Sequence, residues 1–238
     1  MAGSPTAAST SEYLTVSDSV TAANGATGTS FTVQFYLSTD ATITTSDVAI
    51  CSRVVAGIAA GEISTGTTSC YLSPTLTART YYLGAIVDSG NAVAEAVETN
   101  NAAAGNQIAV SRPDLTVTSL VGAPTAVSMS DELTITDVVA ATGGSTPTAF
   151  TVQYYLSTDM SITTADMAIC TRTVEGLAAG ATSTGTTTCA VPPTLAPRTY
   201  YLGAIVDSGN AVPESIQKAQ VSAVPNCGSP QLQMGSLS

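Results

Sequence analysis

The amino-acid sequence predicts an all-β protein built from two tandem antiparallel β-sandwich domains. The chain contains one module written twice, because Phe31–Glu95 aligns on Phe150–Glu214 without a gap and about 47 of about 65 pairs are identical. Apolar residues recur at every second position, which is typical of strands with one face on a core. No segment shows a sustained helical period, so both domains are expected to be sandwiches.

The predicted strands follow one another in each module between turns rich in Gly, Asn, Ser and Pro. In the clearest case, Phe31, Val33, Phe35 and Leu37 alternate with polar or amphipathic residues. The domains are expected to span 1–111 and 112–226, followed by a tail at 227–238. The strands of the first module, which have counterparts in the second, are expected at Leu14–Val20, Phe31–Leu37, Val48–Val55, Ile63–Leu72, Tyr81–Asp88 and Ala102–Val110.

Two cysteines recur at the same places in each module and predict one disulfide per domain. Cys51 and Cys70 have the same spacing as Cys170 and Cys189. A reversal at Ala60–Gly61 places Cys51 and Cys70 opposite one another, as neighbours on a hairpin. Disulfides form in oxidising compartments, so we expect the protein to be extracellular or on the cell surface. The alternative is two buried free thiols in each domain.

The composition argues against several classes of function. The chain has no His and a net charge of −11, which argues against the common nucleophilic enzymes and against nucleic-acid binding. No apolar run reaches the roughly 18 residues of a membrane-spanning helix. We therefore expect no enzymatic activity, no nucleic-acid partner and no membrane span.

Acidic residues at two turns of each module are candidates for a cation site. Carboxylate oxygens suit Ca²⁺, which takes about 6–8 oxygen ligands. The alternative is that Asp, Asn and Gly only shape the turns, and then no cofactor is expected. The candidate calcium residues are Asp40, Asp47, Asp88, Glu95, Asp159, Asp166 and Asp207.

Three motifs resemble one family of bacterial and archaeal surface domains. YYLGAIVDSGNAVAEAVETNN, YLSTD and PDLTVTSLV are similar to parts of the CARDB (cell adhesion related domain found in bacteria) family. The resemblance covers nearly the whole chain and implies an Ig-like sandwich of about seven strands. It also implies an extracellular location and tandem use as a spacer or adhesive unit. In the second copy Ile216–Gln220 replaces Val97–Asn101, so the resemblance does not extend to that turn.

The two ends of the chain predict a mechanism of assembly. PDLTVTSLV opens the second module at Pro113–Val121, but Gly3 already aligns on Gly122, so the first module is expected to lack its first strand and to have an open edge. The last residues, PQLQMGSLS at Pro230–Ser238, align on the same motif. A strand of another chain can pair with an open edge. The expected donor residues are Leu232, Met234 and Leu237.

From these observations we expect a non-enzymatic extracellular protein whose copies polymerise head to tail into a filament by donor-strand complementation. The alternative is an adhesive or carbohydrate-binding spacer of a larger secreted or surface protein, with surface glycans or proteins as partners. The tail match is short, and a chance match in a chain terminus is the other explanation. Cys227, which precedes the tail, is either a cross-link between subunits or a free thiol.

Overall fold

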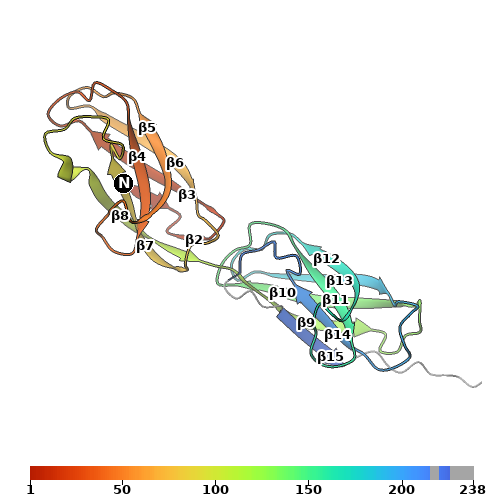
Figure 1. Ribbon diagram of the computed structural model, residues 1–238. Helices are drawn as coiled ribbons and strands as arrows, with labels where there is room; N and C mark the ends of the chain where they lie inside the picture. The colour runs from red at the N-terminus through yellow and green to blue at the C-terminus, as the bar shows by residue number, and fades with distance from the viewer. Residues whose placement is uncertain (215–219, 226–238) are drawn as a thin grey trace, which may run out of the picture. The chain divides into compact units, whose positions relative to one another are not determined.

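A computed structural model describes residues 1–214 and 220–225 of the chain. They form two compact units, which are unit 1, Met1–Arg112, and unit 2, which begins at Pro113. Each unit has its own sheets and its own core (Figure 1). The all-β class is confirmed. Within the described ranges, no helix is long and apolar enough to cross a membrane.

Unit 1 is a sandwich of a three-stranded and a five-stranded sheet. The smaller sheet has the order β1 (Ala2–Ser4), β3 (Tyr13–Thr21) and β6 (Ile63–Tyr71). The larger sheet has the order β2 (Ala7–Ser9), β8 (Ala102–Ser111), β7 (Arg79–Val87), β4 (Phe31–Ser38) and β5 (Val48–Val55). β2 runs parallel to β8, whereas the other neighbours are antiparallel.

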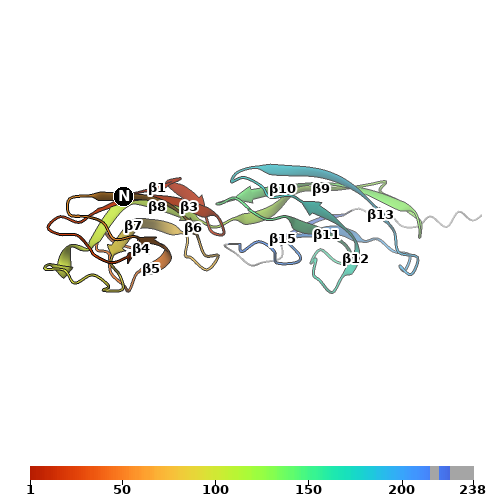
Figure 2. The same ribbon diagram turned by 90° about the horizontal axis from the view of Figure 1, so that it is seen from above.

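Unit 2 repeats this arrangement, and Figure 2 shows its two sheets as separate layers. The three-stranded sheet has the order β13 (Thr182–Ala190), β10 (Glu132–Thr142) and β9 (Asp114–Ala123). The four-stranded sheet has the order β12 (Met167–Val174), β11 (Phe150–Ser157), β14 (Tyr201–Val206) and β15 (Gln220–Pro225). Two antiparallel sheets with this division of strands form an Ig-like sandwich.

The alternation in the sequence produces the two cores. In β4, the side chains of Phe31, Val33, Phe35 and Leu37 are at most 3% exposed, whereas Thr32 is half-buried. Burial of each such apolar side chain stabilises the fold by about 1.5–3 kcal/mol, which fixes the face that a strand turns inward. The same positions of β11 are buried in unit 2.

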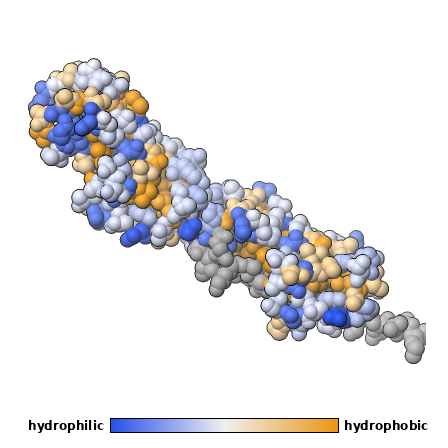
Figure 3. Space-filling view, in the orientation of Figure 1, coloured by the Kyte–Doolittle hydropathy of each residue, from blue (hydrophilic) through white to orange (hydrophobic). Residues whose placement is uncertain are grey.

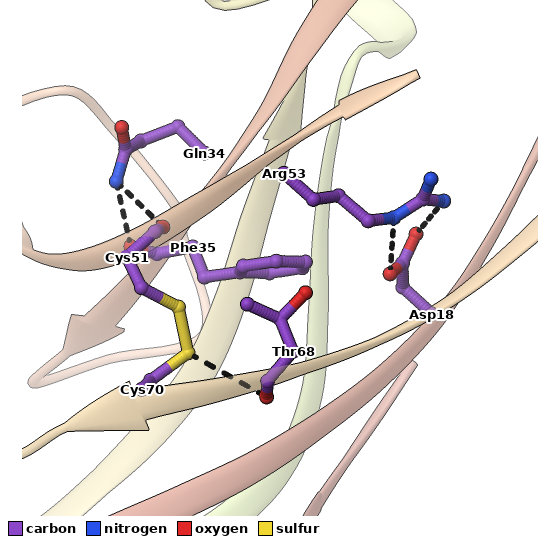
Figure 4. Close-up of a disulfide and its surroundings, with 7 residues drawn as sticks. All are labelled: Asp18, Gln34, Phe35, Cys51, Arg53, Thr68 and Cys70. Carbon is purple, nitrogen blue, oxygen red and sulfur yellow. Dashed lines mark hydrogen bonds and ion pairs between the residues drawn. A yellow bond between two sulfur atoms is a disulfide. The ribbon is translucent and has the colours of Figure 1, made fainter. Parts of the chain in front are cut away.

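Each unit contains the predicted disulfide, but the predicted hairpin is wrong. Cys51 and Cys70 are bonded, with Cα atoms 5.3 Å apart, and Cys170 and Cys189 are bonded, with Cα atoms 5.7 Å apart. β5 pairs with β4, whereas β6 pairs with β3 in the other sheet. The bond therefore joins the two sheets at their edges (Figure 4). The reason is that strands packed face to face can bring the same residues together as a hairpin does.

The first strand differs in length between the units. β9 has ten residues and pairs with nearly the whole of β10. β1 has three residues, which pair with Thr15–Ser17 of β3. The expectation that unit 1 lacks this strand is therefore corrected in one respect: the last part of the strand, Ala2–Ser4, is present and takes the place of Val121–Ala123.

Candidate functional site

Unit 2 shows what a complete first strand does in this sandwich. β9 pairs with the stretch Asp137–Thr142 of β10 as well as with its beginning. Leu115 of β9 lies opposite Ala141 in the register. Its side chain is fully buried and belongs to the core of unit 2. The strand therefore completes the sheet and fills part of the core at the same time.

In unit 1 the corresponding sheet has an open edge. β1 ends with the pair Ala2 and Ser17. Residues Asp18–Thr21 of β3 consequently have β6 as their one sheet neighbour in the described part of the chain. We call Asp18–Thr21 the open edge. Backbone N–H and C=O groups on the free side of such a strand can pair with a strand from elsewhere.

Four apolar side chains of unit 1 are less covered than their counterparts in unit 2. The counterparts are at most 2% exposed and are Val139, Ala141, Val206 and Val212. The residues of unit 1 are half-buried, and we call them the uncovered core residues: Val20, Ala22, Val87 and Val93. Figure 3 shows apolar surface on both units among polar residues. The shortened first strand thus leaves part of the core of unit 1 within reach of solvent.

A buried carboxylate holds the start of β9 in unit 2. Glu214 is 5% exposed, and its Oε1 accepts a hydrogen bond of 2.9 Å from the backbone N–H of Leu115. Burial raises the pKa of Glu214 to about 7, with the charges of Asp207 and Asp114 acting in the same direction and the bond from Leu115 opposing them. Glu214 therefore joins the first strand to the turn after β14.

The turn that carries this carboxylate is built in the same way in both units. In unit 2 the side chain of Asp207 accepts two backbone N–H groups at 2.8 and 3.0 Å. In unit 1 the side chain of Asp88 accepts two, both at 2.9 Å. Both residues are buried and have φ of 49°. Burial raises the pKa of Asp207 despite these bonds. The turn presents Glu214 in unit 2 and Glu95 in unit 1.

Glu95 takes the place of Glu214 in unit 1 but is exposed. Its Oε2 accepts a hydrogen bond from Nδ2 of Asn101 at 2.7 Å. Its backbone N–H donates to Oε1 of Glu98 at 3.1 Å. Within the described residues, no hydrogen bond reaches Oε1 of Glu95. The carboxylate is therefore oriented by its neighbours and has an oxygen that is open to another donor.

The remaining candidates for a cation site also bind backbone groups of their own turns. Asp40 and Asp47 each accept an N–H within one loop, both at 2.7 Å. Asp159 and Asp166 repeat these bonds in unit 2. Across residues 1–214 and 220–225, no three His, Cys, Asp or Glu side chains form a group that could hold a metal ion. These bonds are the ones expected of acidic residues that shape turns.

Each unit also holds an ion pair that was not predicted. In unit 1, Arg53 donates to both oxygens of Asp18 at 2.8 and 2.5 Å, close to the disulfide (Figure 4). In unit 2, Arg172 donates to both oxygens of Asp137 at 2.9 and 2.6 Å. Tyr154 there adds a third bond, from its hydroxyl to Asp137, at 2.6 Å. Burial raises the pKa of Tyr154 to about 12, and the hydrogen bond to Asp137 and the charge of Asp137 act in the same direction.

The expected donor residues are not among those that the structure describes. β15 is the last described element, and its backbone pairs with β14 over Gln220–Pro225. Leu232, Met234, Leu237 and Cys227 lie outside the described ranges.

Comparisons with known proteins agree with the motifs. The CARDB family matches residues 2–105 and 112–223. The crystal structure of a Pyrococcus furiosus CARDB domain in complex with di-metal ions is 24% identical, with a TM-score of 0.35, over 47% of this chain and 89% of that one. A solution NMR structure of that domain is 22% identical, with a TM-score of 0.35, over 47% of this chain and 91% of that one. The D0-D1 domain of intimin is 12% identical, with a TM-score of 0.26, over 95% of this chain and 96% of that one. No curated protein matches. Since the family match includes most of both units, the chain belongs to the CARDB family.

Proposed function

We propose that the protein is a non-enzymatic structural protein of the cell surface whose copies join head to tail. The C-terminal tail of one copy, Pro230–Ser238, pairs as a strand with the open edge of unit 1 in the next copy and covers the uncovered core residues. One observation carries the proposal: these residues are half-buried in unit 1, whereas their counterparts are buried in unit 2, where β9 is complete. The two disulfides and the adhesion-related family support the extracellular location.

The sequence of the tail supports this pairing. When the tail is aligned on β9, Leu232 takes the place of Leu115, which is fully buried in unit 2. Burial of Leu232 in the same way would stabilise the contact by about 1.5–3 kcal/mol. Gly235 takes the place of Thr118, where the register of β9 against β10 shifts by one residue. Glycine suits such a bulge because it tolerates unusual backbone angles.

Met1 limits how far the incoming strand extends. It aligns on Leu120 and packs, partly buried, against the core of unit 1. In the register of β9, the incoming strand therefore pairs as far as Ser236, and Leu237 meets Met1. We expect Leu232 to contribute most to the contact and Leu237 least. Because donor and acceptor are different surfaces, the contact propagates into a filament unless a rotation closes it into a ring.

A second candidate function, recognition of a surface glycan, rests on two aromatic side chains of unit 1. Tyr13 and Tyr71 lie opposite one another on β3 and β6, with ring centroids 5.3 Å apart. They are 63% and 44% exposed. Rings with an apolar body and a polar tip are frequent at binding surfaces. Unit 2 has Glu132 and Ala190 at these positions, so this pair is a feature of unit 1.

Electron microscopy of the purified full-length chain under non-reducing conditions tests strand donation. We expect fibres with two beads per subunit, which disappear on deletion of Gln231–Ser238 while both disulfides and the β-sheet circular dichroism remain. Leu232→Asp should act like the deletion, because it places a charge at the buried position. Ser236→Asp is the matched control and should leave the fibres intact, since Ser119, on which it aligns, is exposed.

Fibres that survive the deletion would contradict strand donation. A monomeric protein that binds glycans saturably, and loses that binding in Tyr13→Ala, would instead support the second candidate.

A further inference from the structure

A strand in the position of β9 must find an acceptor for a buried N–H. Along an edge strand, alternate N–H groups face the neighbouring strand and the opposite side. The N–H of Leu115 is on the opposite side, because it binds Oε1 of Glu214 at 2.9 Å. A buried N–H without an acceptor destabilises a structure strongly. An incoming strand that replaces β9 in unit 1 therefore has the same requirement at Leu232.

Unit 1 has a carboxylate at the corresponding position. The turn before it has the same sequence in both units, DSGNAV. Its two residues with positive φ have nearly the same angles, 49° and 53° for Asp88 and Asn91 and 49° and 51° for Asp207 and Asn210. Glu95 and Glu214 follow this turn at the same distance along the chain.

We propose that Glu95 sets the register of the incoming strand, in that its carboxylate accepts the backbone N–H of Leu232 from the neighbouring copy. This inference rests on the strand donation proposed above. Glu95 is exposed, Asn101 holds its Oε2 at 2.7 Å, and Oε1 has no hydrogen bond within the described residues. The carboxylate is thus oriented before the strand arrives.

The contact distinguishes the correct register from its neighbours. A slip by one residue turns Leu232 outward and brings Gln231 or Gln233 to the inward position, where a polar side chain would be buried in the core. A slip by two residues in one direction places Pro230 opposite Glu95, and proline has no N–H to donate. In the aligned register, Leu232 enters the core and its N–H reaches Glu95 together.

The test uses the chain that lacks Gln231–Ser238 as acceptor and a synthetic peptide of Pro230–Ser238 as probe, and it measures Kd by calorimetry. We expect Glu95→Ala to weaken binding about 10- to 100-fold, the loss of one hydrogen bond to a charged group. N-methylation of Leu232, which removes the N–H, should weaken binding to the unsubstituted acceptor by a similar factor. Both changes together should weaken binding no more than either alone.

Three controls isolate this contact. Glu98→Gln removes the charge of the other carboxylate that binds Asn101 but keeps an acceptor for the backbone N–H of Glu95, and it should change Kd by less than about threefold. N-methylation of Met234 modifies an N–H on the same side of the strand and should weaken binding equally with and without Glu95. Glu95→Gln keeps a carbonyl acceptor and should recover part of the affinity, which also provides a second variant in case Glu95→Ala folds poorly.

The outcomes separate this inference from the function on which it rests. If the effects of Glu95→Ala and of N-methyl Leu232 add in full, the role of Glu95 is overturned while strand donation stands. If the unmodified peptide does not bind the acceptor with both disulfides intact, strand donation is overturned, and the role of Glu95 with it.

Discussion

Unit 1 and unit 2 share most of their sequence but differ in how completely the sandwich is closed. In unit 2 a ten-residue first strand covers β10, and in unit 1 a three-residue strand covers only the start of β3. The difference extends to residues outside these strands, because Val87 and Val93 are half-buried while Val206 and Val212 are buried. The difference in the length of this edge strand is therefore accompanied by a difference in burial in the opposite sheet and in a turn.

The buried ion pair is also more completely enclosed in unit 2 than in unit 1. Asp137 is 0% exposed and is bonded by both Arg172 and Tyr154. Asp18, its counterpart on the open edge, is 8% exposed, and Phe35 stands in the place of Tyr154. The pair in the closed unit is thus more deeply buried and has one more hydrogen bond.

Asp137→Ala and Asp18→Ala should separate the units most clearly. Asp137→Ala leaves a buried guanidinium and a buried hydroxyl without their acceptor, and we expect it to lower the free energy of unfolding of unit 2 by about 3–5 kcal/mol. Asp18→Ala should lower that of unit 1 by about 1–3 kcal/mol, because Arg53 loses its acceptor but no buried hydroxyl does. Hydrogen exchange measured by mass spectrometry resolves the two units. Equal losses would show that coverage by the first strand does not affect this pair.

A pH titration should distinguish the buried carboxylate from the exposed one. The pKa of Glu214 is raised from 4.5 to about 7 in the folded state, so its contribution is fully present below about pH 4.5 and is lost as the pH rises through 7. We expect unit 2 to lose on the order of 3 kcal/mol of stability between pH 4.5 and 8 through this group. Glu214→Gln should remove this part of the dependence in urea unfolding at several pH values.

Glu95→Gln, which changes the exposed counterpart in unit 1, is the control for this titration and should leave the pH dependence of unit 2 as it is. A Glu214→Gln profile that runs parallel to the unsubstituted one would contradict the assignment.

Exchanging Tyr154 and Phe35 should give the smallest effect. Tyr154→Phe removes one hydrogen bond to Asp137 and should lower the free energy of unfolding of unit 2 by about 1–2 kcal/mol. Phe35→Tyr places a hydroxyl near Asp18, both of whose oxygens Arg53 already binds, and should change unit 1 by less than about 1 kcal/mol. Thermal unfolding followed by unit-resolved hydrogen exchange measures both. A larger loss from Phe35→Tyr than from Tyr154→Phe would reverse the comparison.

The strands and the cysteine pairing could be predicted because local patterns encode them. The alternation from Phe31 to Leu37 fixes both the element and its inward face. The arrangement of the sheets could not be predicted in this way. Cys51 and Cys70 approach one another whether β5 and β6 share a sheet or face each other, and only the pairing of β5 with β4 decides between the two.

The acceptor site was only partly visible in the sequence. Alignment of the repeats located the shortened strand, but the partner of Leu115 is Glu214, which lies 99 residues later in the sequence. The buried ion pair did leave a signal, since Asp18 stands at an inward position of an alternating strand. Its partner depends on Gly66, where a Cβ atom would lie 2.4 Å from Nε of Arg53. The space that Gly66 leaves for the side chain of a residue on another strand produces no local pattern in the sequence.

The disulfides that join the sheets have a mechanical consequence for a fibre under tension. When a pulled unit unfolds, it lengthens by the chain that it releases, but the segment between its two bonded cysteines, which are 19 residues apart, cannot be drawn out. At about 3.4 Å for each extended residue, every bond withholds about 60 Å of length. In the proposed filament, each unit that unfolds would lengthen by about 60 Å less than a unit without the bond and would keep a closed loop, so the covalent bonds would limit how far the filament extends before any of them breaks.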